Sequence, residues 1–313
     1  MPSAAAWATS AYGKEGCALK NVKLRRAPGA VLGDVLIYGV GILAVIVTLV
    51  PFLHVIAMSM SDPLLVARQE VFLLPKQIQW DAYRLVLENK VFWSNYGNTI
   101  WIVFFGTAVN IALTVALAYA LSRREFFLRR TLMILVTFTM FFSGGLIPLF
   151  LMVSRLGLYN SRWAVILPYA ISTYNLIVCR SFFEGIPESL MESARLDGAN
   201  DLRILFSIVL PLSGAIVAVL VLFYAVGHWN SYFPAMLFIS KPALQPVQVY
   251  LIRVLIQNSE ALAEEGSAGY SRALVVEQLK YAVIIVTILP IVVLYPFLQK
   301  YFVQGVMIGA IKG

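Results

Sequence analysis

Residues 204–240, ILFSIVLPLSGAIVAVLVLFYAVGHWNSYFPAMLFIS, contain no Asp, Glu, Lys or Arg. A helix needs about 20 consecutive apolar residues to cross the hydrocarbon core of a bilayer, which is about 30 Å thick. This stretch is long enough to do so, and it lacks the charged face that a helix on the surface of a soluble domain carries. It therefore predicts a membrane-spanning helix.

Five further stretches without charged residues meet or approach the same length: 35–61, 91–122, 131–154, 163–179 and 281–299. A chain that is 60% hydrophobic and 13% charged has too little polar sequence to cover a soluble domain. Helices satisfy every backbone polar group in lipid, and the ten-residue alternation of a β-barrel is absent from the sequence. We therefore predict an all-α integral membrane protein with six transmembrane helices, in which Arg180 snorkels to extend the short fourth stretch.

The basic residues predict the orientation of these helices. The net charge of +8 is concentrated in the tail before the first stretch and in Arg123, Arg124, Arg129 and Arg130 after the second. Positive residues in short loops mark the cytoplasmic side of a membrane, so both termini are expected inside and no nucleic-acid partner is needed to explain the charge. We interpret residues 1–30 as a cytoplasmic tail, because the first apolar run is too long for a signal peptide.

The sequence offers no residues for catalysis or for a metal site. His54 and His228 are isolated in the sequence, and Cys17 and Cys179 are expected to stay unpaired in a reducing compartment. A Gly-x-x-x-x-Gly-Lys-Ser/Thr loop for nucleotide phosphates is also missing. We therefore predict a protein that is not an enzyme and that holds no cofactor or metal.

One segment between the fourth and fifth stretches has strong local signals, 184–211 with the sequence EGIPESLMESARLDGANDLRILFSIVLP. Pro187 suits the first position of a helix, and Gly198 suits a left-handed position after its end. Asn200 or Asp201 can cap a second helix, which we expect to run straight into the fifth span. The segment predicts a short helix on the cytoplasmic side of the membrane.

The short helix has an apolar stripe formed by Leu190, Met191 and Ala194, with Glu188, Glu192 and Arg195 on another side. An ordinary exposed helix decorated with charge pairs explains the charged side equally well. The stripe is harder to explain in that way, because an exposed apolar surface needs something to pack against and the chain offers no soluble domain. The stripe indicates a partner protein.

The order Glu192-Ser193-Ala194, then Gly198, Ile208 and Leu210-Pro211 resembles the EAA signature of binding-protein-dependent ABC importer permeases. Ser193 replaces the usual alanine, a small residue for a small one. Three other features resemble the carbohydrate-uptake (maltose-type) branch of these permeases: the pair Trp229-Asn230, the glycine-rich end 301–313 and the step 143–148, SGGLIP. The step is similar to that of permeases for complex oligosaccharides, of the alginate and lipo-oligosaccharide types. Its residues 143–145 and Pro148 are also expected to let the third helix kink or approach a neighbour closely.

The resemblance implies that residues 31–313 form the transmembrane domain of a permease subunit in a bacterial inner membrane, with a coupling segment at about 184–207. It implies a homologous second permease subunit, a dimer of cytoplasmic ATPase subunits that bind ATP and Mg, and an extracytoplasmic solute-binding protein that delivers an oligosaccharide. The glycine-rich end is expected either to reach the ATPase interface or to fray. The residues expected to couple to the ATPase are Glu188, Leu190, Met191, Glu192, Ser193, Ala194, Asp197, Gly198, Ile208, Leu210 and Pro211.

Aromatic and amide side chains in the apolar stretches are candidates for contact with a sugar. They are Asn98, Asn110, Tyr174, Asn175, Tyr224, Trp229, Asn230 and Tyr232. Interface anchoring by Tyr or Trp and hydrogen bonding between helices by Asn explain the same residues. Arg155 and Arg162 either attract an acidic oligosaccharide or anchor the outer membrane interface.

Two other functions compete with this interpretation. A secondary transporter or channel for a small polar solute would work without an ATPase, but ion-coupled transporters usually carry charged residues deep in their spans, and no Asp, Glu, Lys or Arg lies there in this sequence. A membrane-embedded enzyme would need a catalytic cluster, which the two scattered histidines do not supply.

Overall fold

The computed structural model describes residues 28–264 and 277–296, and gives side-chain surroundings for 33–256 and 277–296. These residues are largely helical, and no strand occurs among them. The chain divides into two compact units, 1–52 and 53–313. Nearly all of the tail 1–30, Cys17 and the glycine-rich end 301–313 lie outside the described residues.

The apolar stretches form helices of two kinds. Three helices are long and apolar enough to cross a membrane unaided, namely α1 (Pro28–Met60), α4 (Lys90–Ser122) and Glu277–Pro296. Three further pairs of helices pass the same test only together, because each pair is bent at a short break. The described chain therefore has three spans by length and composition, or up to six if each bent pair is one span, and the count of six stays a prediction.

The other helices are shorter. They are α2 (Pro63–Ala67), α3 (Asp81–Glu88), α5 (Arg129–Phe141), α6 (Leu146–Arg155), α7 (Trp163–Ile166), η1 (Leu167–Tyr169), α8 (Thr173–Glu184), α9 (Glu188–Leu196), α10 (Asp201–Ile204), the π-helix η2 (Leu205–Val209), α11 (Leu210–Leu212), α12 (Gly214–Trp229), α13 (Tyr232–Phe238), η3 (Pro242–Leu244) and α14 (Val247–Glu264).

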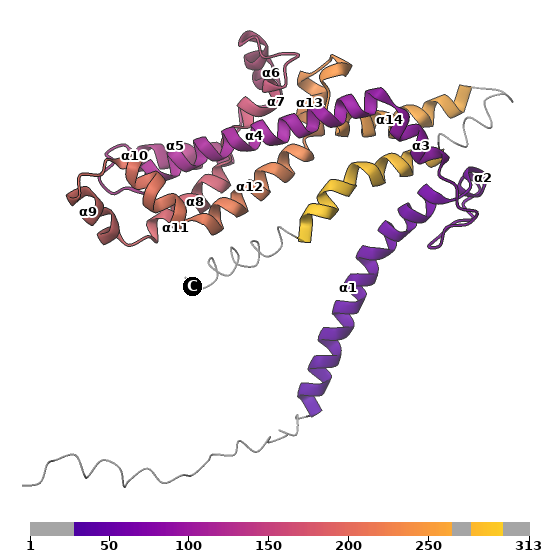
Figure 1. Ribbon diagram of the computed structural model, residues 1–313, viewed down its shortest axis with the longest axis horizontal. Coiled ribbons are helices and arrows are strands. Elements are labelled where there is room, and N and C mark those ends of the chain that lie inside the picture. Colours follow the sequence, from indigo (N-terminus) through magenta and orange to yellow (C-terminus); the bar gives the residue numbers. More distant parts are fainter. Residues whose placement is uncertain (1–27, 265–276, 297–313) are drawn as a thin grey trace, which may run out of the picture. The chain divides into compact units, whose positions relative to one another are not determined.

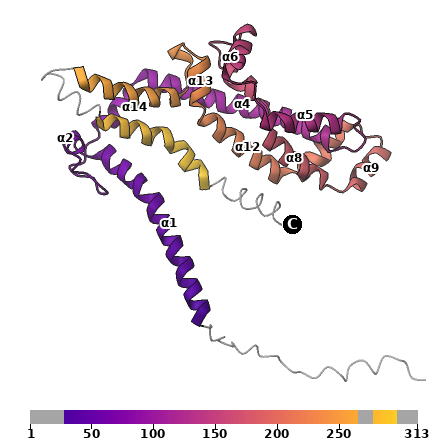
Figure 2. The same cartoon turned by 180° about the vertical axis from the view of Figure 1, so that it is seen from behind.

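The core of the second unit is a bundle in which α4 packs along both α8 and α12 (Figures 1 and 2). Its buried side chains come from all three helices and include Leu121, Leu176 and Leu220. The same apolar cluster continues into Met191 of α9 and Ile204 of α10. These two short helices lie at the end of the bundle where α4 ends and α12 begins (Figure 1).

A second group of short helices, α6, α7 and α13, packs around Val153, Ala164 and Phe238. It is closed by Asn160, which has a left-handed φ of +61°. The Oδ1 atom of Asn160 accepts hydrogen bonds from the backbone N–H of Ser240 at 2.7 Å and of Lys241 at 3.1 Å. An Asn tolerates this conformation better than most residues. The backbone of Asn160 therefore makes the turn, and its side chain makes the hydrogen bonds that close the group.

The third apolar stretch is broken where the sequence predicts a kink. α5 and α6 meet at 118°, and Gly145 between them has a φ of +84°. The kink is confirmed, but it is sharper than a bent span needs, so this pair is either a broken span or a re-entrant loop.

The fourth stretch is also broken, by 53° between η1 and α8, although no Gly lies there. Asn110 of α4 satisfies the carbonyls that this break leaves free. Its Nδ2 donates to the carbonyls of Tyr169 at 2.9 Å and Ala170 at 2.7 Å. The Oδ1 of Asn110 accepts a hydrogen bond from His228 Nε2 at 2.6 Å. A buried carbonyl without a partner would be costly, so Asn110 stabilises the broken backbone.

The expectation that a second helix runs straight from Asn200 into the fifth span is wrong. The segment Asp201–Leu212 and α12 meet at 85°. Pro211 has no N–H to continue the helical hydrogen bonds, and a π-helix directly precedes α11, which contains this proline. α11 ends at Leu212, and its C-cap residue Ser213 donates its backbone N–H to the carbonyl of Leu210 at 3.1 Å.

Two loop segments of the described chain are helical. The stretch 80–87 largely coincides with α3, and its Ala82 and Val86 are buried against Val247 at the start of α14, so α3 packs on the chain itself. The other loop helix is α14, which begins at Val247.

Candidate functional site

The connection from α8 to α9 follows from three residues. α8 ends at Glu184 and is followed by Gly185, whose N–H bonds the carbonyl of Phe182 at 3.0 Å. Pro187 is the N-cap of α9, one position before the place expected from the sequence, with an extended ψ of 129°. The turn is therefore tight, and α9 starts soon after the end of α8.

The end of α9 is the left-handed cap predicted from the sequence. Gly198 has a φ of +81°, its N–H bonds the carbonyl of Arg195 at 3.0 Å, and Ala199 N–H bonds the carbonyl of Ala194 at 2.9 Å. These two bonds define a Schellman motif, which satisfies the last carbonyls of the helix. Asn200 then caps α10 by accepting from the backbone N–H of Arg203 at 2.8 Å, as predicted.

The apolar stripe of α9 does not face outward as a whole. Met191 is only 4% exposed, and Ala194 packs on the same core cluster within the chain. Leu190 is 45% exposed and Leu196 is 90% exposed. The expectation that Met191 offers free apolar surface is therefore wrong in this structure, and the free apolar surface of α9 consists of Leu190 and Leu196.

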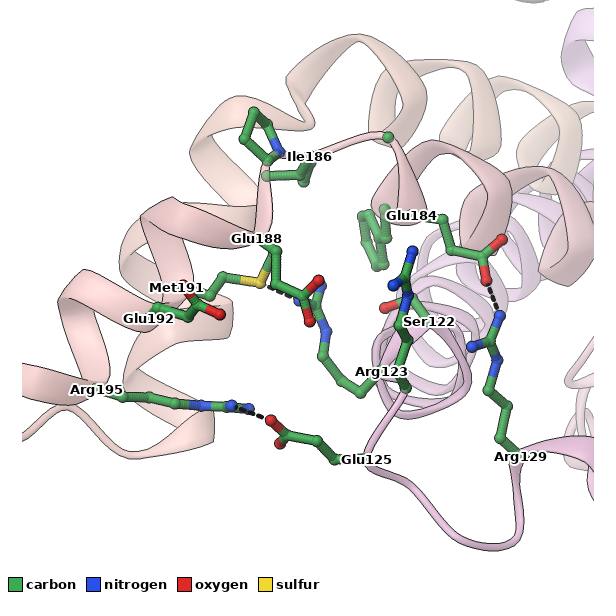
Figure 3. A pocket seen from close by; sticks show the side chains of 14 residues that line it. Ser122, Arg123, Glu125, Arg129, Glu184, Ile186, Glu188, Met191, Glu192 and Arg195 are labelled. Carbon is green, nitrogen blue, oxygen red and sulfur yellow. Dashed lines mark hydrogen bonds and ion pairs between the residues drawn. The ribbon is translucent and has the colours of Figure 1, made fainter.

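Beside α9 the structure contains a pocket of about 480 Å³ (Figure 3). It lies between the loop after α4, the end of α8 and the first turns of α9. Its lining includes four arginines and four glutamates. These are Arg123, Arg124, Arg129, Arg195, Glu125, Glu184, Glu188 and Glu192.

Ion pairs across the pocket tie α9 and α8 to the loop after α4. Arg195 Nη1 donates to Glu125 Oε1 at 2.7 Å (Figure 3). The Nη2 atom of Arg195 lies 3.4 Å from Asp201 Oδ1. The hydrogen bond to Glu125 raises the pKa of Arg195. Glu184 binds both Arg129 and Arg180. Partly exposed pairs of this kind each contribute about 0.2 to 1 kcal/mol, so they set the position of α9 more than its stability.

Arg123 differs from the other arginines of the pocket because two of its guanidinium nitrogens are buried without an acidic partner. Its guanidinium lies over the Tyr119 ring, with Cζ 4.6 Å from the ring centroid, and its Nη1 contacts the thioether of Met191. Its Nε and Nη2 atoms are buried and have no hydrogen-bond partner in the described chain. Burial lowers the pKa of Arg123, because removing a guanidinium cation from water disfavours its charged form.

The sequence matches the family described as the inner membrane component of binding-protein-dependent transport systems, over residues 108–308. The chain belongs to this family. It is therefore a multi-pass protein of the bacterial plasma membrane and a permease of the ABC transporter type.

Two relatives from Bacillus subtilis (strain 168) extend the similarity over most of the chain. The permease is 42% identical over 282 residues to the polygalacturonan/rhamnogalacturonan transport system permease protein YtcP, covering 90% of this chain and 99% of the relative. It is 41% identical over 267 residues to Protein LplC, covering 85% and 90%.

A solved structure also resembles the permease. A chain in the crystal structure of a bacterial ABC transporter involved in the import of the acidic polysaccharide alginate matches with a TM-score of 0.81 and 35% identity. The match covers 88% of this permease and 99% of that chain.

The remaining residues of the predicted coupling set lie at two places in the permease. Glu188, Glu192, Ser193 and Asp197 are exposed on or next to α9. Ile208, Leu210 and Pro211 lie in η2 and α11, at the bend before α12. The signature thus spans both the short helix and its joint with the next span.

The predicted sugar contacts of the permease also fall into two groups. Asn98, Asn110, Asn175, Tyr224 and Trp229 are buried. Asn98 donates to the carbonyl of Ala243 at 2.8 Å, and the Tyr224 hydroxyl is 2.7 Å from Thr114 Oγ1. Tyr174, Asn230 and Tyr232 are exposed. Contact with a sugar stays a prediction for all eight, and the exposed three are available to a ligand in this structure.

These two groups predict different phenotypes. Asn110→Leu should lower the melting temperature of the permease, because Tyr169, Ala170 and His228 would lose buried partners that are each worth about 1 to 3 kcal/mol. Tyr174→Leu, at a side chain that is 58% exposed, should leave the melting temperature unchanged and reduce uptake. Thermal unfolding in nanodiscs and transport by the same preparations separate the two effects, and equal melting temperatures would contradict the prediction.

The sequence did not single out Arg123, Glu125 or Glu184. Each of them binds or contacts a residue more than fifty positions away, as the contact of Arg123 with Met191 and the ion pair of Glu125 with Arg195 show. The available signal was the concentration of arginines directly after a span, which indicated orientation only.

Proposed function

We propose that this chain is one of two homologous permease subunits that together form the path of an ATP-driven oligosaccharide importer. The observation that carries the proposal is the match to a chain of the alginate importer over 88% of the permease, with a TM-score of 0.81. An extracytoplasmic binding protein delivers the sugar, and a dimer of cytoplasmic ATPase subunits binds ATP and Mg. The name of the relative YtcP, a permease for polygalacturonan and rhamnogalacturonan, supports a substrate of the same general class.

The side of the membrane on which α9 lies is inferred from charge. The ion pair between Arg195 and Glu125 holds α9 against the loop that contains Arg123 and Arg124 and that leads to Arg129 at the start of α5. A short loop with this density of positive charge faces the cytoplasm, so α9 faces the cytoplasm too. The chain termini are inside under the same orientation.

In this proposal α9 is the coupling helix. Its exposed Leu190 and Leu196 pack against the ATPase, and Glu192 anchors the contact through a charge-assisted hydrogen bond. Packing of Met191 and Ala194 on the core of the bundle holds α9 in place, and the Schellman cap at Gly198 and the ion pair of Arg195 with Glu125 fix its direction. When the ATPases close on ATP, α9 moves as a rigid body, and the spans attached to it rock between inward-open and outward-open states.

The substrate is proposed to be an acidic oligosaccharide, as in the alginate importer. Arg162 lies over the Trp101 ring, with Cζ 4.6 Å from the ring centroid, and Trp101 in turn meets Trp163 edge to face. A cation beside aromatic faces suits a sugar that carries a carboxylate. Arg155, in the last turn of α6, adds a second cation to the same region of the sequence.

Reconstitution tests the proposal. The permease and its sister subunit in nanodiscs should retain an ATPase, and the binding protein should stimulate ATP hydrolysis when loaded with alginate or galacturonate oligosaccharides. Neutral glucose oligosaccharides serve as the control and should stimulate far less. If the purified permease pair transports sugar without any ATPase, it is a secondary transporter or channel and the proposal is wrong. If neutral sugars stimulate ATP hydrolysis as well as acidic ones, the preference for an acidic substrate is wrong, and the rest of the proposed function stands.

A further inference from the structure

Arg123 has more hydrogen-bonding capacity than its surroundings use. A guanidinium carries five N–H donors, yet Arg123 contacts only a tyrosine face and a thioether sulfur in the described chain. Its Nε and Nη2 atoms are buried without partners. Burying a charged group in this way is costly unless an anion completes its hydrogen bonds. The pocket is therefore incomplete as it stands.

The carboxylates around the pocket do not complete it. Glu125 is bound by Arg195, and Glu184 is shared by Arg129 and Arg180. Glu188 and Glu192 also line the pocket, but within the described residues no ion pair joins either of them to Arg123. Glu188 attracts Arg123 electrostatically, but no carboxylate of the described chain hydrogen-bonds it, so an anion of another molecule can fill its open N–H positions.

The balance of charge in the pocket indicates which anion fits. Four arginines and four glutamates line it, so it has no strong positive field of the kind that attracts a free dianion. A phosphate would accept hydrogen bonds from Arg123, but the nearby glutamates would repel it. A single carboxylate carries less negative charge than a phosphate and is repelled less, and when it belongs to a docked protein the rest of the protein contact offsets that repulsion.

The geometry also indicates how the guanidinium becomes accessible. The side chain of Met191 of α9 contacts the guanidinium of Arg123. Methionine is unbranched and adapts its shape readily. Leu190, its neighbour in the sequence, is exposed on the surface that the ATPase covers in the proposed function. Docking on that surface can shift Met191 and open Arg123 toward the pocket.

We propose that the pocket between α9 and the loop after α4 accepts an Asp or Glu side chain of the partner ATPase, which Arg123 binds through its unused N–H groups. The inference rests on the proposed function, because it needs an ATPase on α9. It assigns recognition to a loop nearly seventy residues before the coupling helix, in addition to α9 itself.

The test compares Arg123→Met with Arg130→Met in the complete permease pair in nanodiscs. Arg130 is an exposed arginine close by on α5 that does not line this pocket. Arg123→Met should weaken binding of the purified ATPase at least about tenfold, the loss expected for one charge-assisted hydrogen bond. Arg130→Met should stay near the wild-type Kd, and Arg123→Lys should retain part of the affinity.

A second measurement excludes a merely structural role. Without the ATPase, Arg123→Met should melt at or above the wild-type temperature, because methionine removes an unpaired buried charge. A lower melting temperature, or an unchanged ATPase Kd, would overturn the inference. Inorganic phosphate that stabilises the wild-type pair but not Arg123→Met would assign the pocket to a free anion and also overturn it. If wild-type permease binds no ATPase at all, the proposed function itself fails.

Discussion

Replacing Gly198 by Val should abolish ATP-driven uptake while the subunit still inserts in the membrane. Gly198 has a φ of +81°, and no neighbouring atom lies within 4 Å of the place that a Cβ would occupy. Only the backbone conformation, and not a steric clash, therefore opposes a side chain at this position. A left-handed conformation costs an L-residue about 1 to 2 kcal/mol, and β-branching adds to that cost. Val would unwind the Schellman cap and change the angle between α9 and α10.

Gly198→Asn is the matched control, because asparagine tolerates left-handed dihedrals and the site has room for it. It should keep most of the uptake. The decisive measurement is the number of ATP molecules hydrolysed per sugar transported in proteoliposomes, which should rise sharply for Val and little for Asn. Normal uptake by Gly198→Val would show that the cap does not transmit movement.

Gly106→Ala should destabilise the permease strongly, although it adds only one methyl group. A Cβ at Gly106 would lie 2.5 Å from Nε2 and 2.8 Å from two ring carbons of His228. The ring has to move, and it then loses the hydrogen bond between Nε2 and Asn110 Oδ1. Overpacking costs about 1 to 3 kcal/mol, and the lost buried hydrogen bond adds to this amount.

Gly97→Ala in the same helix is the control, since nothing lies within 4 Å of its added Cβ. Alanine favours helix over glycine by about 1 kcal/mol, so this variant should be neutral or slightly more stable. The melting temperatures of both variants in nanodiscs check the prediction. Equal values for the two alanines would mean that His228 moves aside without cost.

Local signals in the sequence were enough for several features. The apolar stretches predicted the helices, Gly198 predicted the left-handed cap, and Asn200 predicted the start of α10. The glycines at 144 and 145 predicted the break between α5 and α6. Each of these depends on the backbone preferences of one or two residues, which the sequence states directly.

Features that depend on distant contacts could not be predicted. The break before α8 has no glycine, and it is held by Asn110 on another helix. Met191 looked like free apolar surface because the periodicity of a helix shows its faces and not its neighbours. Arg123 looked like one of several orientation signals, and its lack of an acidic hydrogen-bond partner emerges only in the structure, where Glu125 and Glu184 bind other arginines.

The interruptions in the third and fourth apolar stretches should differ in stiffness. Asn110 clamps the interruption before α8 with two hydrogen bonds, and the hydroxyl of Tyr224 accepts a third from Ser172 N–H. Among the described residues, no side-chain hydrogen bond spans the interruption between Phe141 and Leu146. Bending during each transport cycle is therefore expected between Phe141 and Leu146. A spin label on α6 should report larger movements than one on α8.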